Sequence, residues 1–331
     1  MDPLTHTATG LFLSRAGLNR WTPLAAPILM LAANAPDIDI VTATGGSLNY
    51  LQYHRHLTHS LVAMPVMAIL PVLLVRGVWR QPIHWAGAFF AALIAVASHL
   101  LLDLTNVYGI RLLLPFSSDW LRLDLNSIID LWIWAAFLLG VVSPWLSRMV
   151  SSEISSSKAH APHHGRTSAI CALVFVLLYD GGRVALHARA VAALESHLYQ
   201  GEVPARAVAV PGLIPWRWRG VVETSGAYHV SDLDLSGSFN PESAELFLKP
   251  APDPALEVAR QTLTFQRFLT FDQFPLWRVT PAPQPEGGKR VELFDMRFGT
   301  PAQPGFMTSA LLSARGVVVE TAFQFGAPRR P

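Results

Sequence analysis

Long apolar runs separated by short polar connections fill the first part of the chain. A straight helix needs about 20 apolar residues to cross a bilayer, and the later runs approach or reach that length. The first two runs are shorter and predict a tight helical hairpin buried among other helices. The runs are Leu4–Leu18, Pro23–Ala35, Leu61–Val75, Ile83–Leu102, Ile128–Leu146 and Thr167 to about Leu194. This pattern predicts an α-helical polytopic membrane domain over residues 1–194.

From about Val203 the pattern changes to alternating apolar and polar positions, with frequent Pro and Gly. Alternation with a period of two is typical of half-buried strands. It is evident in Gly220–Thr224, Arg290–Phe298 and Gly316–Phe325, whereas Pro254–Phe271 has the pattern of one amphipathic helix. We therefore predict a small α+β soluble domain, mostly antiparallel β, over residues 195–331.

Composition favours a membrane protein and argues against several other classes. Of the 331 residues, 51% are hydrophobic and 15% are charged, a balance that is unusual for a soluble protein. The formal net charge of +2 and the scattered arginines argue against a nucleic-acid partner. A single cysteine, Cys171, excludes a disulfide framework and a cysteine-based zinc site. The N-terminus lacks the pattern of a cleaved signal peptide, so we expect an uncleaved start.

Histidine and aspartate side chains gather where the apolar runs begin or end. His54-Arg55-His56-Leu57-Thr58-His59-Ser60 stands just before one run, and His99 and Asp103 lie four residues apart near the end of the next. Positions i and i+4 share one face of a helix, so the latter two side chains can converge. Imidazole and carboxylate are typical zinc ligands, and ionisable groups near membrane depth indicate function. The predicted metal ligands are His6, Asp37, His54, His59, His99 and Asp103.

Several members of this set have alternatives. His54 and His56 cannot both be assumed to point inward, and we prefer His54 as the ligand. One of Asp37 and Asp39 is a better candidate than both, and an unligated Asp39 can act as the general base that orients a water molecule. His6 is included because the predicted hairpin brings it to the same end as Asp37.

Three further residues have predicted roles at the same face. Asp130, just before a Trp-rich run, is a candidate ligand, a partner of a ligating histidine, or the general base. Arg183 and His187, again four residues apart, form a predicted anion clamp for a phosphate or carboxylate of the substrate. An equally good interpretation of this pair is snorkelling at the membrane interface.

The distribution of Lys and Arg over the short loops predicts an orientation in the membrane. One set of turns carries Arg15, Arg20, Arg76, Arg80, Arg148, Lys158 and Arg166. That side should be cytoplasmic. The predicted ligands and the soluble domain then face the periplasm or the cell exterior, in a multi-pass protein of the bacterial inner membrane.

These motifs resemble those of the LexA-binding, inner-membrane-associated hydrolases, also called membrane-bound metal-dependent hydrolases, over residues 1 to about 190. The matching pieces are His6, Pro36-Asp37-Ile38-Asp39, His54 to Ser60, His99 to Asp103, Asn106, Gly109 and Leu114-Pro115-Phe116. The family's usual small residue after His-Arg is here His56. The order His, Asp, His and then His-x-x-x-Asp is also similar to that of the zinc-dependent phospholipase C and single-strand nuclease group. That likeness implies zinc ligation by His6, Asp37, His59, His99 and Asp103.

Two functions of different classes follow from these features. The first is a metal-dependent hydrolase, in which metal-activated water attacks a phosphoester or lipid-linked substrate at the outer membrane face. The alternative is a non-enzymatic membrane protein with a structural metal site and a soluble domain that binds a protein partner. An open, water-bearing position on the metal distinguishes a catalytic site from a structural one.

Overall fold

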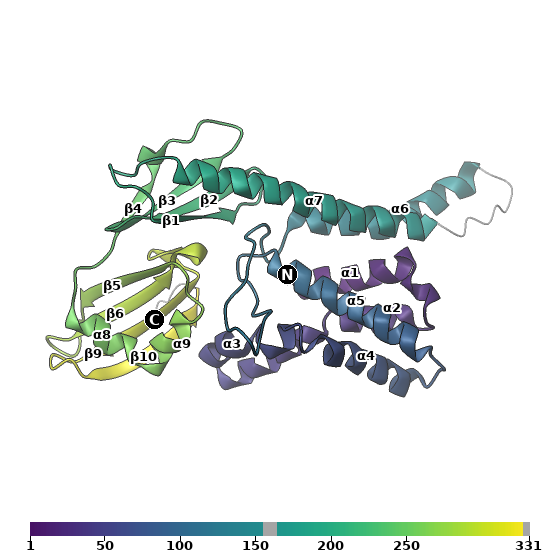
Figure 1. The fold of residues 1–331 in the computed structure, drawn as a ribbon, viewed down its shortest axis with the longest axis horizontal. Helices are drawn as coiled ribbons and strands as arrows, with labels where there is room; N and C mark the ends of the chain where they lie inside the picture. The colour runs from purple at the N-terminus through teal and green to yellow at the C-terminus, as the bar shows by residue number, and fades with distance from the viewer. Residues whose placement is uncertain (155–163, 327–331) are drawn as a thin grey trace. The chain divides into compact units, whose positions relative to one another are not determined.

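The computed structural model describes residues 1–154 and 164–326, and its internal contacts divide the chain into two units. The helical unit comprises Met1–Asp39 and Arg55–Ala185, and the sheet unit comprises Ile40–His54 and Leu186–Pro331. Figure 1 shows the helices of the first and the two sheets of the second. Helix α7 (His164–Glu195) carries the chain from one unit into the other.

The first two helices of the helical unit form the hairpin that the sequence predicts. Helices α1 (Pro3–Ala16) and α2 (Ala25–Ala32) pack against each other along their length. Gly10 permits this close approach, because a Cβ atom at that position would lie 2.5 Å from the carbonyl oxygen of Leu29. The small residue therefore sets the spacing of the hairpin.

Helices α4 (Met64–Trp79) and α5 (Trp85–Leu104) pack beside this hairpin, as Figure 1 shows. The buried face of α5 is built from small side chains that let neighbouring backbones approach closely. These fully buried residues are Ala88, Ala91, Ala92 and Ala95. The same helix continues to His99 and Asp103, so this tight packing fixes the position of both side chains.

Among the described residues, two helices are long and apolar enough to cross a membrane, Trp85–Leu104 and Gly165–Glu195. Up to four spans result if each of two bent helix pairs counts as one. Leu177 and Leu178 of α7 are 72% and 71% exposed, as expected of a surface that faces lipid tails rather than water. The N-terminal region is thus helical with candidate apolar spans, in agreement with the sequence prediction.

One predicted span differs in length. The run Ile128–Leu146 corresponds to α6 (Leu131–Ile154), but the helix begins only at Leu131 because Asp130 caps it. Its apolar part, Leu131–Ser147, is then shorter than the other candidate spans. Residues 155–163 of the predicted linker Ser147–Arg166 lie outside the described residues, and its two ends belong to α6 and α7 instead of a linker.

The sheet unit contains two four-stranded antiparallel sheets in its described part. The first has the order β1-β2-β3-β4 and the second β10-β9-β6-β5, with a short β7-β8 pair beside them. The strands are β1 (Arg206–Pro211), β2 (Arg217–Glu223), β3 (Ala227–Asp234), β4 (Glu245–Leu248), β5 (Pro275–Pro281), β6 (Lys289–Asp295), β7 (Gly299–Thr300), β8 (Gln303–Pro304), β9 (Phe306–Leu312) and β10 (Val318–Phe325). The three alternating segments of the sequence correspond to β2, β6 and β10, which confirms them as strands, except that Met296–Phe298 at the end of the second segment forms a 3-10 helix.

The predicted amphipathic helix Pro254–Phe271 is wrong as a single element. The chain forms two helices there, α8 (Pro254–Arg260) and α9 (Leu263–Leu269). Thr262 interrupts the run because its side chain accepts a hydrogen bond from the backbone N–H of Phe265 and so starts a new helix.

Residues 40–54 also belong to the sheet unit, which the sequence did not indicate. Their helix α3 (Ser47–Tyr53) packs against α9 and β10, and the Ser47 hydroxyl donates to the carbonyl of Phe323. The chain therefore leaves the helical unit after Asp39 and returns to it at Arg55.

Candidate metal centre

Helix α5 supplies two side chains to a buried cluster in the helical unit. His99 and Asp103 lie one turn apart, and both are fully buried. The Nδ1 atom of His99 lies 2.7 Å from the carbonyl oxygen of Ala33, at the C-terminal end of α2 where helix carbonyls lack helical partners. A carbonyl can only accept, so Nδ1 carries the proton and the Nε2 lone pair faces the cluster.

His59 is held in a similar way. It ends the short 3-10 helix Leu57–His59 and is fully buried. Its Nδ1 atom lies 3.2 Å from Oδ2 of Asp39, a carboxylate that also accepts from the Thr58 hydroxyl and the Arg55 backbone N–H. A carboxylate on Nδ1 fixes the tautomer and directs the Nε2 lone pair at the cluster, the usual arrangement behind a metal-bound histidine.

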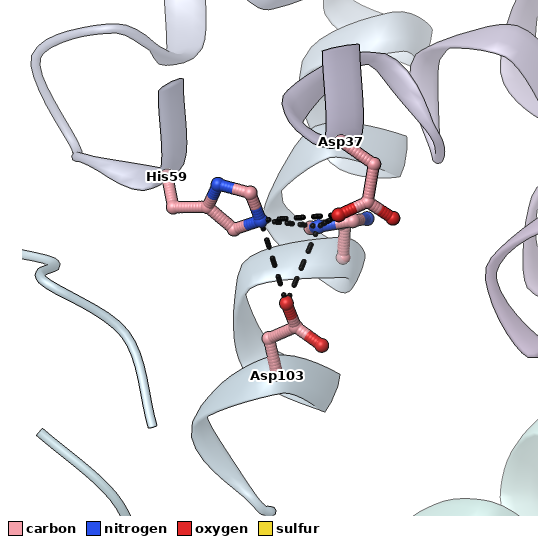
Figure 2. Close-up of side chains that lie close together, drawn as sticks. Asp37, His59 and Asp103 are labelled. Atoms are coloured by element: carbon pink, nitrogen blue, oxygen red, sulfur yellow. Dashed lines mark hydrogen bonds and ion pairs between the residues drawn. The ribbon is translucent and has the colours of Figure 1, made fainter. Parts of the chain in front are cut away.

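Asp37, in the 3-10 helix Ala35–Gly45, completes a group of four whose donor atoms converge. Figure 2 shows Asp37, His59 and Asp103 pointing toward one another. The His59 Nε2 atom lies 3.1 Å from Nε2 of His99, 3.4 Å from Oδ1 of Asp37 and 3.5 Å from Oδ2 of Asp103. His99 Nε2 lies 3.7 Å and 3.5 Å from the same two oxygens.

These separations match the edges of a zinc coordination tetrahedron. With metal–ligand distances of about 2.0–2.1 Å, the ligands of a tetrahedral zinc lie roughly 3.3 Å apart. All four donor atoms lie within 4.8 Å of one another. Two bare Nε2 lone pairs that face each other at 3.1 Å repel unless a cation lies between them. No described residue donates a hydrogen bond to the buried Oδ2 of Asp103. The residues present therefore fit a single metal ion.

The other carboxylate oxygen of Asp103 is anchored by two cations. Oδ1 accepts from Nη2 of Arg55 at 3.0 Å and contacts the Met1 amino group. Arg55 is buried, and its Nη1 donates to Oδ1 of Asn106 and the carbonyl of Gly109. Sequence spacing did not assign this arginine a role, although it stands between two histidines of the first motif and contacts three residues that carry the family resemblance, Asp103, Asn106 and Gly109.

Two of the predicted ligands lie outside this group of four. His6 is fully buried with its ring stacked 3.8 Å from that of His99, and its Nε2 lies 3.4 Å from Oδ1 of Asp103. His6 is thus a neighbour of the cluster, beside Oδ1 of Asp103, the oxygen that Arg55 and the Met1 amino group also contact. His54 belongs to the sheet unit, where it ends α3 with its ring stacked on Tyr50.

The remaining predicted site residues have other contacts. Asp130 accepts from the backbone N–H groups of Trp132 and Ile133 and from the Tyr179 hydroxyl, so it serves as the N-cap of α6. Arg183 is 1% exposed, and its Nε donates to the carbonyl of Leu125.

His187 lies in the sheet unit, with its ring 5.4 Å from that of Trp218. The substrate-binding roles of Arg183 and His187 stay predictions.

These features define a class: membrane proteins whose helices enclose a buried cluster of four residues that is able to hold a metal ion. Within that class, the chain belongs to the family of the YdjM inner membrane protein, which matches residues 1–190. It is also similar to the uncharacterized protein YfhP of Bacillus subtilis (strain 168), with 29% identity over 151 residues. That match covers 43% of this chain and 45% of the relative's length, so the chain spans less than half of the relative it matches. No solved structure matches the chain.

Proposed function

We propose that this protein is a membrane-bound metal-dependent hydrolase whose metal ion is held by Asp37, His59, His99 and Asp103. The observation that carries the proposal is the convergence of two imidazole nitrogens and two carboxylate oxygens at tetrahedral spacing. Two nitrogen and two oxygen donors suit zinc. Zinc bound by such ligands acidifies water to a pKa near 7 and stabilises charge on a substrate oxygen.

The surrounding residues have defined tasks in this proposal. Asp39 keeps the His59 ring in the ligating tautomer through Nδ1, and Arg55 holds Asp103 in place through Oδ1. Asp37 alone among the four ligands has an exposed side chain, at 21%. We assign its second carboxylate oxygen the task of accepting the proton of the attacking water. The sequence-based assignment of a general base to Asp39 or Asp130 stays a prediction, and the contacts of both residues favour positioning roles.

The proposed substrate is a phosphoester or a lipid-linked molecule. Two arguments support it: the ligand order is similar to that of the zinc-dependent phospholipase C group, and the family is one of inner membrane proteins. A site beside the bilayer has direct access to lipid-linked molecules, which partition into it.

One observation favours a second candidate, a structural metal site in a non-enzymatic protein. His59, His99 and Asp103 are fully buried, and structural zinc sites are closed to solvent whereas catalytic sites keep an open position. In that case the sheet unit would act by binding a protein partner.

A combined measurement of metal content and hydrolysis tests both candidates. Wild-type protein, His99→Ala and Asp37→Ala are purified in detergent, loaded with zinc and measured by elemental mass spectrometry, thermal unfolding and hydrolysis of a chromogenic phosphodiester. His84→Ala is the matched control, because this exposed histidine stands at the start of the same helix α5.

The hydrolase predicts about one zinc per chain and hydrolysis in wild type and control, and loss of both in folded His99→Ala protein. A structural site predicts stoichiometric zinc without hydrolysis of any phosphoester tested, and a lower unfolding temperature in both ligand variants. Wild-type protein that binds no zinc would exclude both candidates.

We further propose a multi-pass topology with the metal site and the sheet unit on the periplasmic or outer face. The argument is the concentration of Arg and Lys in loops of the opposite side, in particular Arg15, Arg20, Arg76 and Arg80. A reporter enzyme that is active only outside the cytoplasm, fused after Pro331, tests the orientation. Activity of the fused reporter is the expected result, and activity of a cytoplasm-specific reporter at the same position contradicts it.

A further inference from the structure

The loop that follows helix α5 carries Phe116, which has the largest exposed fraction of any large apolar side chain in the described part of the chain. Phe116 is 87% exposed, and Leu113 in the same turn is 41% exposed. The turn has a defined backbone, because the N–H groups of Phe116 and Ser117 both donate to the carbonyl of Leu113, at 2.9 and 3.1 Å. An ordered turn of the helical unit therefore presents two apolar side chains at its surface.

A backbone hydrogen bond joins this loop to the segment that precedes α4. The N–H of Leu61 donates to the carbonyl of Leu112 at 3.0 Å, and Leu61 is itself 50% exposed. Exposed apolar side chains then follow one face of α4 at spacings of three and four residues. They are Val66, Leu70, Leu73 and Leu74. The exposed apolar surface of the loop thus continues along a helix.

The length of α5 indicates the depth of this loop in a membrane. The helix is a candidate span of 20 residues, and at 1.5 Å per residue it covers about 30 Å, the thickness of the hydrocarbon core. Residues that follow Leu104 then lie at the level of the lipid headgroups. Helix α4 packs against α5 and is joined to it by the short segment Arg80–His84, so the start of α4 lies at this same end.

The turn also has a polar side. The Ser117 hydroxyl donates to Oδ2 of Asp119 at 2.6 Å, and both Ser118 and Asp119 are exposed. A carboxylate is costly inside a bilayer, whereas segments that lie in the interfacial layer combine Leu or Phe on one side with polar groups on the other. The turn has this composition within a few residues.

We propose that lipid covers Leu61, Leu113 and Phe116, and that the turn docks into the interfacial layer of the bilayer that α5 crosses. Leu113 and Phe116 lie among the headgroups and upper acyl chains, and Ser118 faces water. The occupant is lipid because the same apolar surface continues along α4 and because the turn follows the end of a candidate span.

This docking would set the depth of the candidate metal cluster. Asp103 lies in the last turn of α5, so a loop anchored just beyond it keeps the cluster close to the headgroups. The docking does not depend on whether the cluster binds a metal ion, and it can fail while the metal site stands.

The test uses the full chain in phosphatidylcholine vesicles. Cys171 is replaced by serine, and a nitroxide spin label is attached to Leu113→Cys or Phe116→Cys. The accessibility of each label to oxygen, which concentrates in lipid, is compared with its accessibility to a water-soluble nickel complex. Thermal unfolding of each labelled protein confirms that it is folded.

Two further label positions are the controls. Ser118→Cys is the matched control, because Ser118 is exposed in the same turn but lies on its polar side. Leu101→Cys is the lipid reference, since Leu101 is 64% exposed within the candidate span α5. A difference between 116 and 118 then reports the sidedness of the turn rather than its exposure.

The proposal predicts an oxygen-to-nickel ratio several-fold higher at 113 and 116 than at 118, and close to the ratio at 101. Equal ratios at 113, 116 and 118 would show that the turn has no lipid-facing side and overturn the proposal. Low accessibility of the labels at 113 and 116 to both reagents would show that protein covers them, which overturns it as well. A ratio at 101 as low as that at 118 would place this end of α5 in water, with the same consequence.

Discussion

Two buried clusters of charged side chains, one in each unit, differ in where the compensating charge comes from. In the helical unit, Asp37, His59, His99 and Asp103 direct donor atoms at a common point. In the sheet unit, Asp295 faces the guanidinium of Arg297, with Asp272 nearby. The converging atoms of the first group are imidazole nitrogens and carboxylate oxygens, whereas in the second group a guanidinium lies directly against the carboxylate.

In the cluster of the sheet unit, the Arg297 guanidinium compensates the charge of Asp295. Arg297 Nε donates to both oxygens of Asp295 at 3.0 Å, and its Nη2 donates to Asp295 and to the carbonyl of Phe271. The guanidinium also lies within 5.1 Å of the ring centres of Phe271 and Phe298. Charges paired in this way compensate each other and need no ligand.

The comparison teaches that burial of charge alone does not indicate a binding site. What distinguishes the candidate metal cluster is that its outer atoms contact surrounding groups, whereas its inner atoms converge on one another. His59 and His99 each use Nδ1 for an oxygen acceptor, and Asp103 uses Oδ1 for cations. The atoms left over all face one point, which is the arrangement a metal ion requires.

The largest expected effect comes from removing Arg297, the cation of the cluster in the sheet unit. Arg297→Met leaves Asp295 buried without its partner, which should lower the free energy of unfolding by about 3–5 kcal/mol. The double variant Asp295→Leu with Arg297→Met should recover most of that loss, because no unpaired charge remains. Chemical denaturation monitored by tryptophan fluorescence measures both. Zinc content should stay that of wild type, and a loss of zinc in either variant would contradict the separation of the two clusters.

A smaller effect is expected from weakening the support of a metal ligand. Asp39→Asn replaces the carboxylate on His59 Nδ1 with a neutral amide, which should lower zinc affinity about 10- to 100-fold. Competition with a zinc-binding dye measures the affinity, and Asp119→Asn in an exposed loop of the same unit is the control. Equal affinities of the Asp39 and Asp119 variants would remove Asp39 from the metal site.

The smallest effect concerns the one carboxyl of the sheet cluster that has no cation of its own. Burial raises the pKa of Asp272 well above its usual range, and the nearby Asp295 carboxylate adds to the rise. The native state then holds this proton more tightly than the unfolded chain does. Stability from this group is therefore lost as the pH rises above about 4, the ordinary pKa of an aspartate.

Asp272→Asn tests this dependence, because the amide can still accept the hydrogen bond from the Phe274 backbone N–H. The difference in unfolding free energy between variant and wild type should grow in favour of the variant as the pH is raised from 4 to 7. A difference that stays constant over this range would show that Asp272 ionises normally. Asp253→Asn, at a carboxylate whose pKa a neighbouring lysine lowers, is the control: its difference from wild type should change little between pH 4 and 7, because stability from a lowered pKa is lost only as the pH falls below about 4.

The sequence was sufficient for features that depend on local periodicity. Helices α5 and α7 and strands β2, β6 and β10 follow from hydrophobic spacing alone. The i, i+4 spacing of His99 and Asp103 likewise indicated that they converge, as the helix places them.

Features that depend on side-chain hydrogen bonds or distant contacts were not predictable. Thr262 divides one apolar pattern into two helices through a single cap. Arg55 reaches Asp103 and Asn106 from far away in sequence, and spacing carries no information on such contacts. His54 and His59 look equivalent in the sequence, yet only His59 has a donor atom in the group of four.

The path of residues 40–54 has a consequence for how the family can vary. Residues 40–54 form a closed loop, because the Arg55 backbone N–H donates to Oδ2 of Asp39 at 2.8 Å. Lengthening a closed loop costs only about 0.6 kcal/mol for each doubling. Insertions can therefore lengthen this loop while the hydrogen bond between Arg55 and Asp39 keeps Asp37 and His59 in register. The candidate ligands Asp37 and His59, which lie on either side of this loop, would then keep their positions when the loop changes in length.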